Sequence, residues 1–179
     1  PRNISTAMMY SFDNRSDCFA TDEPLYANYL LSTKTAHPDA DEVIDHYETD
    51  LESIISHLTG SIPDDMPVWY QKHMSHHVTE DADLDWLDGL TNCFLIRDPR
   101  EVPLSLSNVT DVVNLWVMGL PQQVRILSHV VETTGKEPPI LDARDVLDDP
   151  VGILSALCER LEIEYMDEMA SWAPGPRDC

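Results

Sequence analysis

Charged and imidazole side chains follow three short apolar runs that have the composition of buried β-strands. The runs are residues 18–21, 68–71 and 94–96. Right-handed crossovers place the carboxyl ends of parallel strands on one edge of a sheet, where open α/β sheets bind their ligands. At such an edge a carboxylate or an imidazole can accept a proton, and a lysine or arginine can hold an anion. The side chains in question are Asp22, Glu23, Lys72, His73, Arg97 and Asp98.

The opening segment, residues 1–6, reads as a loop that leads into a helix over residues 7–12. A loop at a helix N-terminus is a natural anion site, because free backbone N–H groups and the positive end of the helix dipole face the ligand. Ser5 and Thr6 would have the same geometry as plain N-caps without any ligand.

These side chains need a framework that alternates strands with helices. Helical spacing of apolar residues is clearest over residues 41–58, and Gly60 follows as a stop signal. The whole pattern predicts a single α/β domain with a mainly parallel sheet flanked by helices. The expected strands are residues 18–21, 67–71, 92–96 and 139–143, and the expected helices are residues 7–12, 41–58, 83–90, 115–134 with an interruption near Pro121, and 150–161.

Composition limits the partners. The 179 residues include 33 Asp and Glu against 11 Lys and Arg, which gives a formal net charge of −22. Nucleic acids and anionic membranes need a basic surface, so neither is expected as the main partner. The acidic surface indicates solvation or adaptation to high salt, where screening weakens self-repulsion. The cysteines, at 18, 93, 158 and 179, form no CxxC or Cys/His ligand pattern, which favours reduced thiols in a cytoplasmic protein.

Two segments together resemble the sulfotransferase family. Residues 1–6, Pro-Arg-Asn-Ile-Ser-Thr, look like the loop that holds the 5′-phosphosulfate of 3′-phosphoadenosine 5′-phosphosulfate (PAPS), and most closely like the loop of sulfotransferase-like proteins with Pro-Arg-Asn. Residues 94–106 resemble the segment that binds the 3′-phosphate, with a strand, an Arg, a Pro, and a Ser eight residues after the Arg. Residues 140–150 resemble the family's later strand, turn and closing helix. The order and separation of the motifs make the match far more specific than either motif alone.

The resemblance implies a P-loop NTPase-like sulfotransferase fold and PAPS as the sulfuryl donor. It implies an acceptor hydroxyl or amine on a small molecule or glycan. Ile4 stands where the family commonly has Gly, which predicts a wider loop or a different backbone path. The chain has no Gly-rich loop ending in Lys-Ser or Lys-Thr, which argues against ATP hydrolysis. The donor-binding residues implied are Arg2, Asn3, Ile4, Ser5, Thr6, Arg97 and Ser105.

For the chemistry, Glu23 and His73 are equal candidates for the base that takes the acceptor's proton. Lys72 is the candidate cation for the transferring group. Each assignment has a simpler alternative: Arg97 could form a surface ion pair with Asp98 or Glu101, and Lys72 could be an ordinary surface lysine. A catalytically silent nucleotide-binding or anion-binding module of the same fold is the alternative function.

The histidines at 73, 76 and 77 also suggest a metal-binding site as a hypothesis. A helix would place His73 and His77 on one face, much as in H-E-x-x-H sites, but Met74 replaces the Glu and no third ligand is assignable. We therefore expect no metal, and expect His76 and His77 to line the acceptor pocket or to cap the following helix. A metal hydrolase is the third reading.

The motif that opens the chain begins at Pro1, where the family has a preceding strand. The sequence reading is thus one sulfotransferase-like domain over residues 1–179, truncated at both ends and without its first strand. No run is long enough for a membrane span, and no signal peptide opens the chain.

Overall fold

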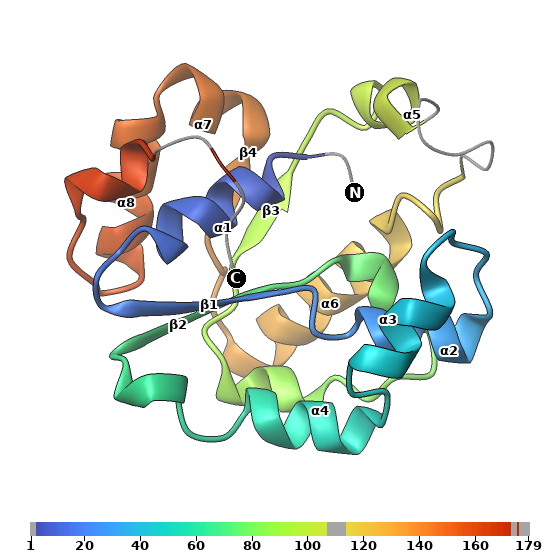
Figure 1. The fold of residues 1–179 in the computed structure, drawn as a ribbon. Helices are drawn as coiled ribbons and strands as arrows, with labels where there is room; N and C mark the ends of the chain where they lie inside the picture. Colours follow the sequence, from blue (N-terminus) through green and yellow to red (C-terminus); the bar gives the residue numbers. More distant parts are fainter. Residues whose placement is uncertain (1–2, 107–113, 173–174, 176–179) are drawn as a thin grey trace.

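The protein folds into two pairs of parallel strands surrounded by helices, as the computed structural model of residues 3–106, 114–172 and 175 shows (Figure 1). The strands are β1 (Cys18–Asp22), β2 (Val68–Lys72), β3 (Phe94–Ile96) and β4 (Ile140–Asp142). The α-helices are α1 (Ser5–Asp13), α2 (Tyr26–Thr33), α3 (Ala40–His46), α4 (Leu51–Leu58), α5 (Glu101–Leu106), α6 (Leu120–Thr134), α7 (Ala143–Asp148) and α8 (Pro150–Arg160). The 3-10 helices are η1 (Pro63–Asp65), η2 (Ser75–His77), η3 (Asp85–Gly89) and η4 (Asp167–Ala170).

Both strand pairs are parallel, which confirms the predicted α/β class. β1 pairs with β2 in a register that sets Asp22 beside Lys72, and β3 pairs with β4. In the described residues the two pairs form separate two-stranded sheets. Helix α6 links the two halves: Gln123 Nε2 donates to the backbone oxygen of Leu95 on β3 at 3.1 Å, and Ser75 Oγ in η2 donates to the oxygen of Gly119 at 2.9 Å.

The two faces of the β1–β2 pair pack against different apolar clusters, because side chains alternate along a strand. Val68 and Tyr70 pack against a cluster built mainly by α1, α8 and η4, where Tyr70 stacks on Phe12 with ring centroids 4.3 Å apart. Trp69 packs against a second cluster, which α4, η3 and Leu25 supply. The sheet is therefore the middle of three layers, and its carboxyl end lies between the clusters.

The predicted single helix over residues 41–58 is wrong, since two helices, α3 and α4, occupy this range. The backbone of Tyr47 is extended, with φ −116° and ψ 155°, and ends α3. Asp50 then caps α4 by accepting a hydrogen bond from the Ser53 N–H at 2.9 Å. A cap of this kind stabilises a new helix start by about 1 kcal/mol, enough to break a continuous apolar pattern.

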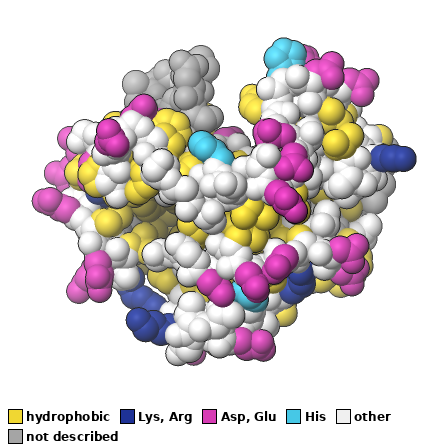
Figure 2. Space-filling view, turned by 90° about the horizontal axis from the view of Figure 1, so that it is seen from below, with side chains coloured by type: hydrophobic (Ala, Val, Ile, Leu, Met, Phe, Trp, Pro, Cys, Tyr) yellow, Lys and Arg dark blue, Asp and Glu magenta, His cyan; other side chains and the backbone are white. Residues whose placement is uncertain are grey.

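Segments that leave β1, β2 and β3 run toward the side of the molecule that carries α2, η2 and α5 (Figure 1). Acidic side chains are spread over the surface in Figure 2 and few Lys or Arg side chains lie among them, as the net charge of −22 predicts. No helix in the described residues is both long enough and apolar enough to cross a bilayer.

Candidate functional site

Lys72 forms the charged centre of the site at the end of β2. Its Nζ lies 2.6 Å from Asp22 Oδ1 and 2.7 Å from Glu23 Oε1, and only 5% of the side chain is exposed. The parallel register explains the first contact, because it places Asp22 directly opposite Lys72. Burial alone would lower the pKa of Lys72, but the hydrogen bonds to the two carboxylates outweigh it and hold the pKa above its ordinary 10.5. Lys72 is therefore a buried cation.

Glu23 is fixed by its backbone as well as by Lys72. Its N–H donates to the Lys72 oxygen at 2.9 Å, and its own oxygen accepts from the Tyr26 N–H at 2.9 Å. Glu23 also has a φ of 45°, in the left-handed region that non-glycine residues rarely occupy. A conformation of this kind costs about 1–3 kcal/mol and persists only where the surroundings impose it. The turn after β1 therefore directs the carboxylate to one place.

His73 follows Lys72 directly along the chain. The residue as a whole is half-buried; its Nε2 lies 3.3 Å from Gln71 Oε1, and its ring centroid is 5.6 Å from that of Trp86. Its Nδ1 is buried and has no hydrogen-bond partner among the described residues. Burial lowers the pKa of His73 to about 4, so the ring is neutral at neutral pH.

His76 and His77 lie together in η2, with ring centroids 4.3 Å apart. The metal-site hypothesis required one helix to carry both His73 and His77. His73 lies before η2, so the two histidines do not share a helical face. Burial is the main cause that lowers the pKa of His76 to about 4 and that of His77 to about 2. In the described parts of the chain, no group of three potential metal ligands includes these histidines. One such group lies elsewhere, at Asp85, Asp88 and His129.

The loop before α1 is tied to β3 by Asn3. Its Oδ1 accepts from the Ser5 N–H at 3.2 Å, and its Nδ2 donates to the Leu95 oxygen at 3.4 Å. Asn3 thus supplies the side-chain oxygen at the start of α1, a role that the sequence reading gave to Ser5 and Thr6. Ser5 and Thr6 form the first turn of α1. Ile4 has φ −87° and packs against the α1 core cluster, so this loop follows a path that does not need glycine.

Arg97 leaves β3 two residues after Leu95 and pairs with α5. Its Nε donates to Glu101 Oε2 at 3.1 Å, with 33% and 40% of the two side chains exposed. Glu101 is shared, because its Oε1 accepts from Arg144 at 2.8 Å. The ion pair foreseen as the alternative role of Arg97 therefore exists with Glu101, whereas Asp98 pairs with Arg100.

Two of the predicted donor-binding residues fall where the structure describes no side chain. Arg2 lies outside the described residues, and Ser105 is described only as part of the backbone of α5. The described candidates form two groups. The contacts above join Glu23 to Lys72, with His73 next along the chain, and they join Asn3 and Ser5 to β3 close to Arg97.

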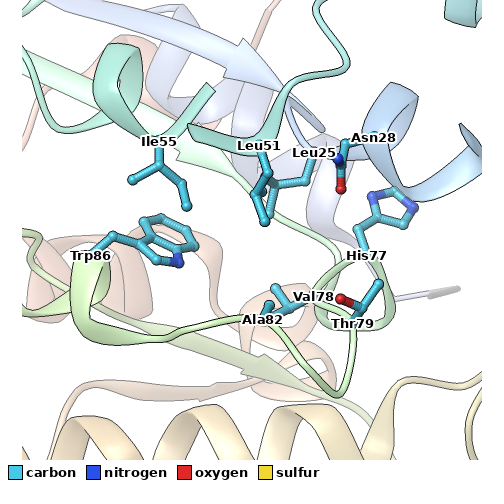
Figure 3. Close-up of a pocket in the computed structure, with 9 residues that line it drawn as sticks. All are labelled: Leu25, Asn28, Leu51, Ile55, His77, Val78, Thr79, Ala82 and Trp86. Carbon is cyan, nitrogen blue, oxygen red and sulfur yellow. The ribbon is translucent and has the colours of Figure 1, made fainter. Parts of the chain in front are cut away.

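A small cavity lies beside His77 and is shown in Figure 3. Leu51 and Ile55 of α4 and Trp86 of η3 form apolar walls, and Asn28, His77 and Thr79 supply the polar atoms. The enclosed volume is about 10 Å³, which holds about one water molecule. His77 therefore lines a cavity, but this space is too small for an acceptor molecule, so it is not the acceptor pocket that His76 and His77 were predicted to line.

Comparison with known proteins adds a family and a fold. Residues 1–179 match the family model described as sulfotransferase domain. Two Arabidopsis thaliana proteins are similar, branched-chain-amino-acid aminotransferase-like protein 2 with 32% identity over 176 residues and protein 1 with 33% over 179 residues. Each match covers 98% of this chain and 31% of the relative, so the chain spans about a third of those proteins. The solved sulfotransferase domain from the curacin biosynthetic pathway matches with a TM-score of 0.55 and 14% identity, over 94% of this chain and 73% of that one, which shows a common fold.

Proposed function

This chain belongs to the sulfotransferase domain family, and on that premise we propose that it transfers a sulfuryl group from PAPS to a hydroxyl or amine of a small-molecule or glycan acceptor. One observation carries the proposal. Asn3 binds the Leu95 oxygen at 3.4 Å, which brings the start of α1 to β3, two residues from Arg97. The two segments that resemble donor-binding motifs are therefore neighbours in space, although Asn3 and Leu95 are 92 positions apart along the chain.

The residues at this place suit a donor with two phosphate groups. The first turn of α1 offers backbone N–H groups and the positive end of a helix dipole, with Ser5 and Thr6 hydroxyls beside them. Arg97 offers a guanidinium at the strand end, which suits a phosphate better than a lysine does. When bound, PAPS would supply the activated sulfuryl group. Arg2 and Ser105 remain proposed donor-binding residues.

Arg97 must exchange partners to hold a phosphate. Its pair with Glu101 is open to solvent, and exposed pairs of this kind contribute about 0–1 kcal/mol. A dianionic phosphate offers the guanidinium a stronger acceptor than one carboxylate does. The pair with Glu101 is thus compatible with donor binding and lowers its affinity modestly.

Glu23 is the base that the geometry favours. About a quarter of its side chain is exposed, and one of its two oxygens, Oε1, is bonded to Lys72. Lys72 keeps positive charge beside the carboxylate and near the place where charge develops during transfer. His73 is the less suitable base, because its Nδ1 is buried and its Nε2 faces Gln71 Oε1 at 3.3 Å. The proton from the acceptor would then reside on the carboxylate of Glu23.

Thermal unfolding with 3′-phosphoadenosine 5′-phosphate (PAP) tests donor binding. Ligand at about 100 times its Kd stabilises a protein by about 2.7 kcal/mol, which for a chain of this size raises Tm by about 5–10 °C. Arg97→Ala should abolish the shift. Arg160→Ala is the matched control, because Arg160 lies at the end of α8 and donates to the backbone oxygen of Glu137 at 2.9 Å. If neither PAP nor PAPS moves the Tm of the unmodified protein, the proposal is wrong.

Sulfuryl transfer is tested separately, with PAPS and a panel of hydroxyl and amine acceptors. Glu23→Gln should keep the PAP-induced shift and lose transfer, whereas His73→Asn should keep both. Loss of transfer in His73→Asn with retention in Glu23→Gln would assign the base to His73. PAP binding with no transfer to any acceptor would favour the catalytically silent module.

A further inference from the structure

His77 is held more rigidly than any role in lining a small cavity requires. Its ring lies between the rings of Tyr26 and Tyr29, with both centroids 4.9 Å away and interplanar angles of 23° and 29°. Only 2% of its side chain is exposed. Tyr26 and Tyr29 are three residues apart on α2, so they lie on the same side of that helix and form a clamp for one flat ring.

The clamp points one edge of the ring at Glu23. His77 Nε2 lies 3.9 Å from Glu23 Oε2, while the other carboxylate oxygen, Oε1, accepts from Lys72 at 2.7 Å. The two oxygens of the Glu23 carboxylate therefore face different neighbours. Oε1 is neutralised by the lysine, and Oε2 is the oxygen available for the proton of an acceptor.

The other ring nitrogen indicates which tautomer is present. Nδ1 of His77 is buried and has no hydrogen-bond partner in the described residues. The carboxylate lies on the Nε2 side, so the proton of a neutral ring is favoured on Nε2. Burial, followed by His76, His73 and Lys72, lowers the pKa of His77 to about 2, which keeps the ring neutral. His77 thus presents a fixed N–H dipole and no positive charge.

We propose that His77 is a positioning residue, which aims Oε2 of Glu23 at the acceptor through its Nε2–H edge. The inference rests on the proposed function, since it takes Glu23 as the base. At 3.9 Å the contact is longer than the 2.7–3.2 Å or so of a hydrogen bond, so it restricts the rotation of the carboxylate without binding it firmly. Oε2 remains able to accept a proton, and the ring beside it is stacked on Tyr26 and Tyr29.

Titratable groups surround His77 on three sides. Glu23 follows β1, Lys72 and His73 lie at the end of β2, and His76 precedes His77 in η2. Tyr26 and Tyr29 face the ring from α2. Lys72 stays charged and the two other histidines stay neutral at neutral pH. Among these groups, the carboxylate of Glu23 is the one proposed to take the acceptor's proton.

Two substitutions separate packing from positioning. His77→Phe keeps a flat ring between the tyrosines and removes the N–H group, whereas His77→Gln places an amide N–H close to the position of Nε2. We expect His77→Phe to lower kcat about 10- to 100-fold, the scale of a misplaced catalytic group. The KM for PAPS and the PAP-induced Tm shift should be unchanged, because the proposed phosphate-binding residues, Arg97 and the start of α1, do not include His77. His77→Gln should recover kcat to within a few-fold of the unmodified protein.

The pH profile of kcat gives a readout that packing alone would not move. An N–H group beside a carboxylate favours its ionised form, so its removal in His77→Phe should move the acid limb to higher pH. If a His77 variant fails to fold, Tyr29→Leu opens one side of the clamp and should move kcat and the acid limb in the same directions. The inference is overturned if a folded His77→Phe or Tyr29→Leu protein keeps the kcat and the acid limb of the unmodified protein. It is also overturned if folded His77→Gln and His77→Phe proteins are equally impaired. Failure of the unmodified protein to bind PAP or transfer sulfuryl groups overturns the proposed function instead.

Discussion

Glu101 accepts a hydrogen bond from the Nε of Arg97 at 3.1 Å, four residues back along the chain, and so occupies a guanidinium that the proposed donor needs. Glu101→Gln removes the competing charge. The affinity for PAP should rise about two- to fivefold, since an exposed pair is worth about 0.5–1 kcal/mol. Isothermal titration calorimetry measures the change.

The control for this prediction is Glu159→Gln, which changes the net charge equally at an exposed position on α8. An equal gain in both variants would show that overall charge, and not the pair with Arg97, opposes the donor. No gain in Glu101→Gln would contradict the role given to Arg97.

Lys72→Met should destabilise the fold. Asp22 and Glu23 would be left side by side with no cation between them, although 37% and 28% of their side chains are exposed to water. We expect a loss of about 1–3 kcal/mol in the free energy of unfolding, below the full effect of breaking a buried pair because water screens both carboxylates. Urea denaturation measures it, and Lys136→Met on the exposed surface should change it by less than about 0.5 kcal/mol. Equal effects of the two substitutions would contradict this account.

Stability should fall as the pH drops below about 6.5, the ordinary pKa of histidine. Burial lowers the pKa of His73 and His76 to about 4 and that of His77 to about 2 in the folded protein. Between these values and about 6.5 the unfolded chain binds protons that the folded protein does not. Each of the three histidines should therefore lower the free energy of unfolding by about 1.4 kcal/mol for each pH unit of acidification.

His76→Asn tests this pH dependence. Urea unfolding at several pH values from 4.5 to 7.5 should show a slope smaller by about one proton than in the unmodified protein. The exposed His46 provides the matched control, and His46→Asn should leave the slope as it is. Identical slopes in all three proteins would mean that His76 is protonated in the folded state.

Salt should first strengthen and then weaken PAP binding. A protein with a net charge of −22 repels an anionic ligand at long range, and moderate salt screens that repulsion before it screens the close contacts with Arg97 and α1. The Kd for PAP should therefore pass through a minimum between very low and high NaCl. A Kd that rises steadily from the lowest salt concentration would contradict this expectation.

Local signals were enough to locate the strands and the charged ends of the site. β1, β2 and β3 are short apolar runs, and each is followed by the polar residues that the sequence singled out. The ion pair of Arg97 with Glu101 was also foreseen, since residues four apart meet on a helix or at its start. The break between α3 and α4 was missed, because the apolar spacing continues through Tyr47 and the capping by Asp50 interrupts it.

Contacts between distant segments could not be read from the sequence. The bond from Lys72 to Glu23 depends on the register of β1 against β2, which a pattern within one strand does not determine. The clamp on His77 depends on two tyrosines of α2 that lie some fifty residues earlier along the chain. Glu23 and His73 were equal candidates in the sequence for this reason: the hydrogen bond from Lys72 to Glu23 and the buried Nδ1 of His73, which distinguish them, appear only in the packed molecule.

Gly119 shows how the spacing between the two halves of the site is kept. Its φ is +73°, and a Cβ there would overlap Ser75 Oγ and come within 3.1 Å of the His76 nitrogen. The start of α6 thus packs closely against η2, the segment that carries His76 and His77. One turn later, Gln123 Nε2 donates to the backbone oxygen of Leu95 on β3. In the described residues no strand pairing joins the two sheets, so the contacts of α6 help to set the distance between the proposed base and the proposed donor-binding loop. A side chain at position 119 would push α6 away from the histidine segment, and so should impair the proposed transfer without altering any proposed site residue.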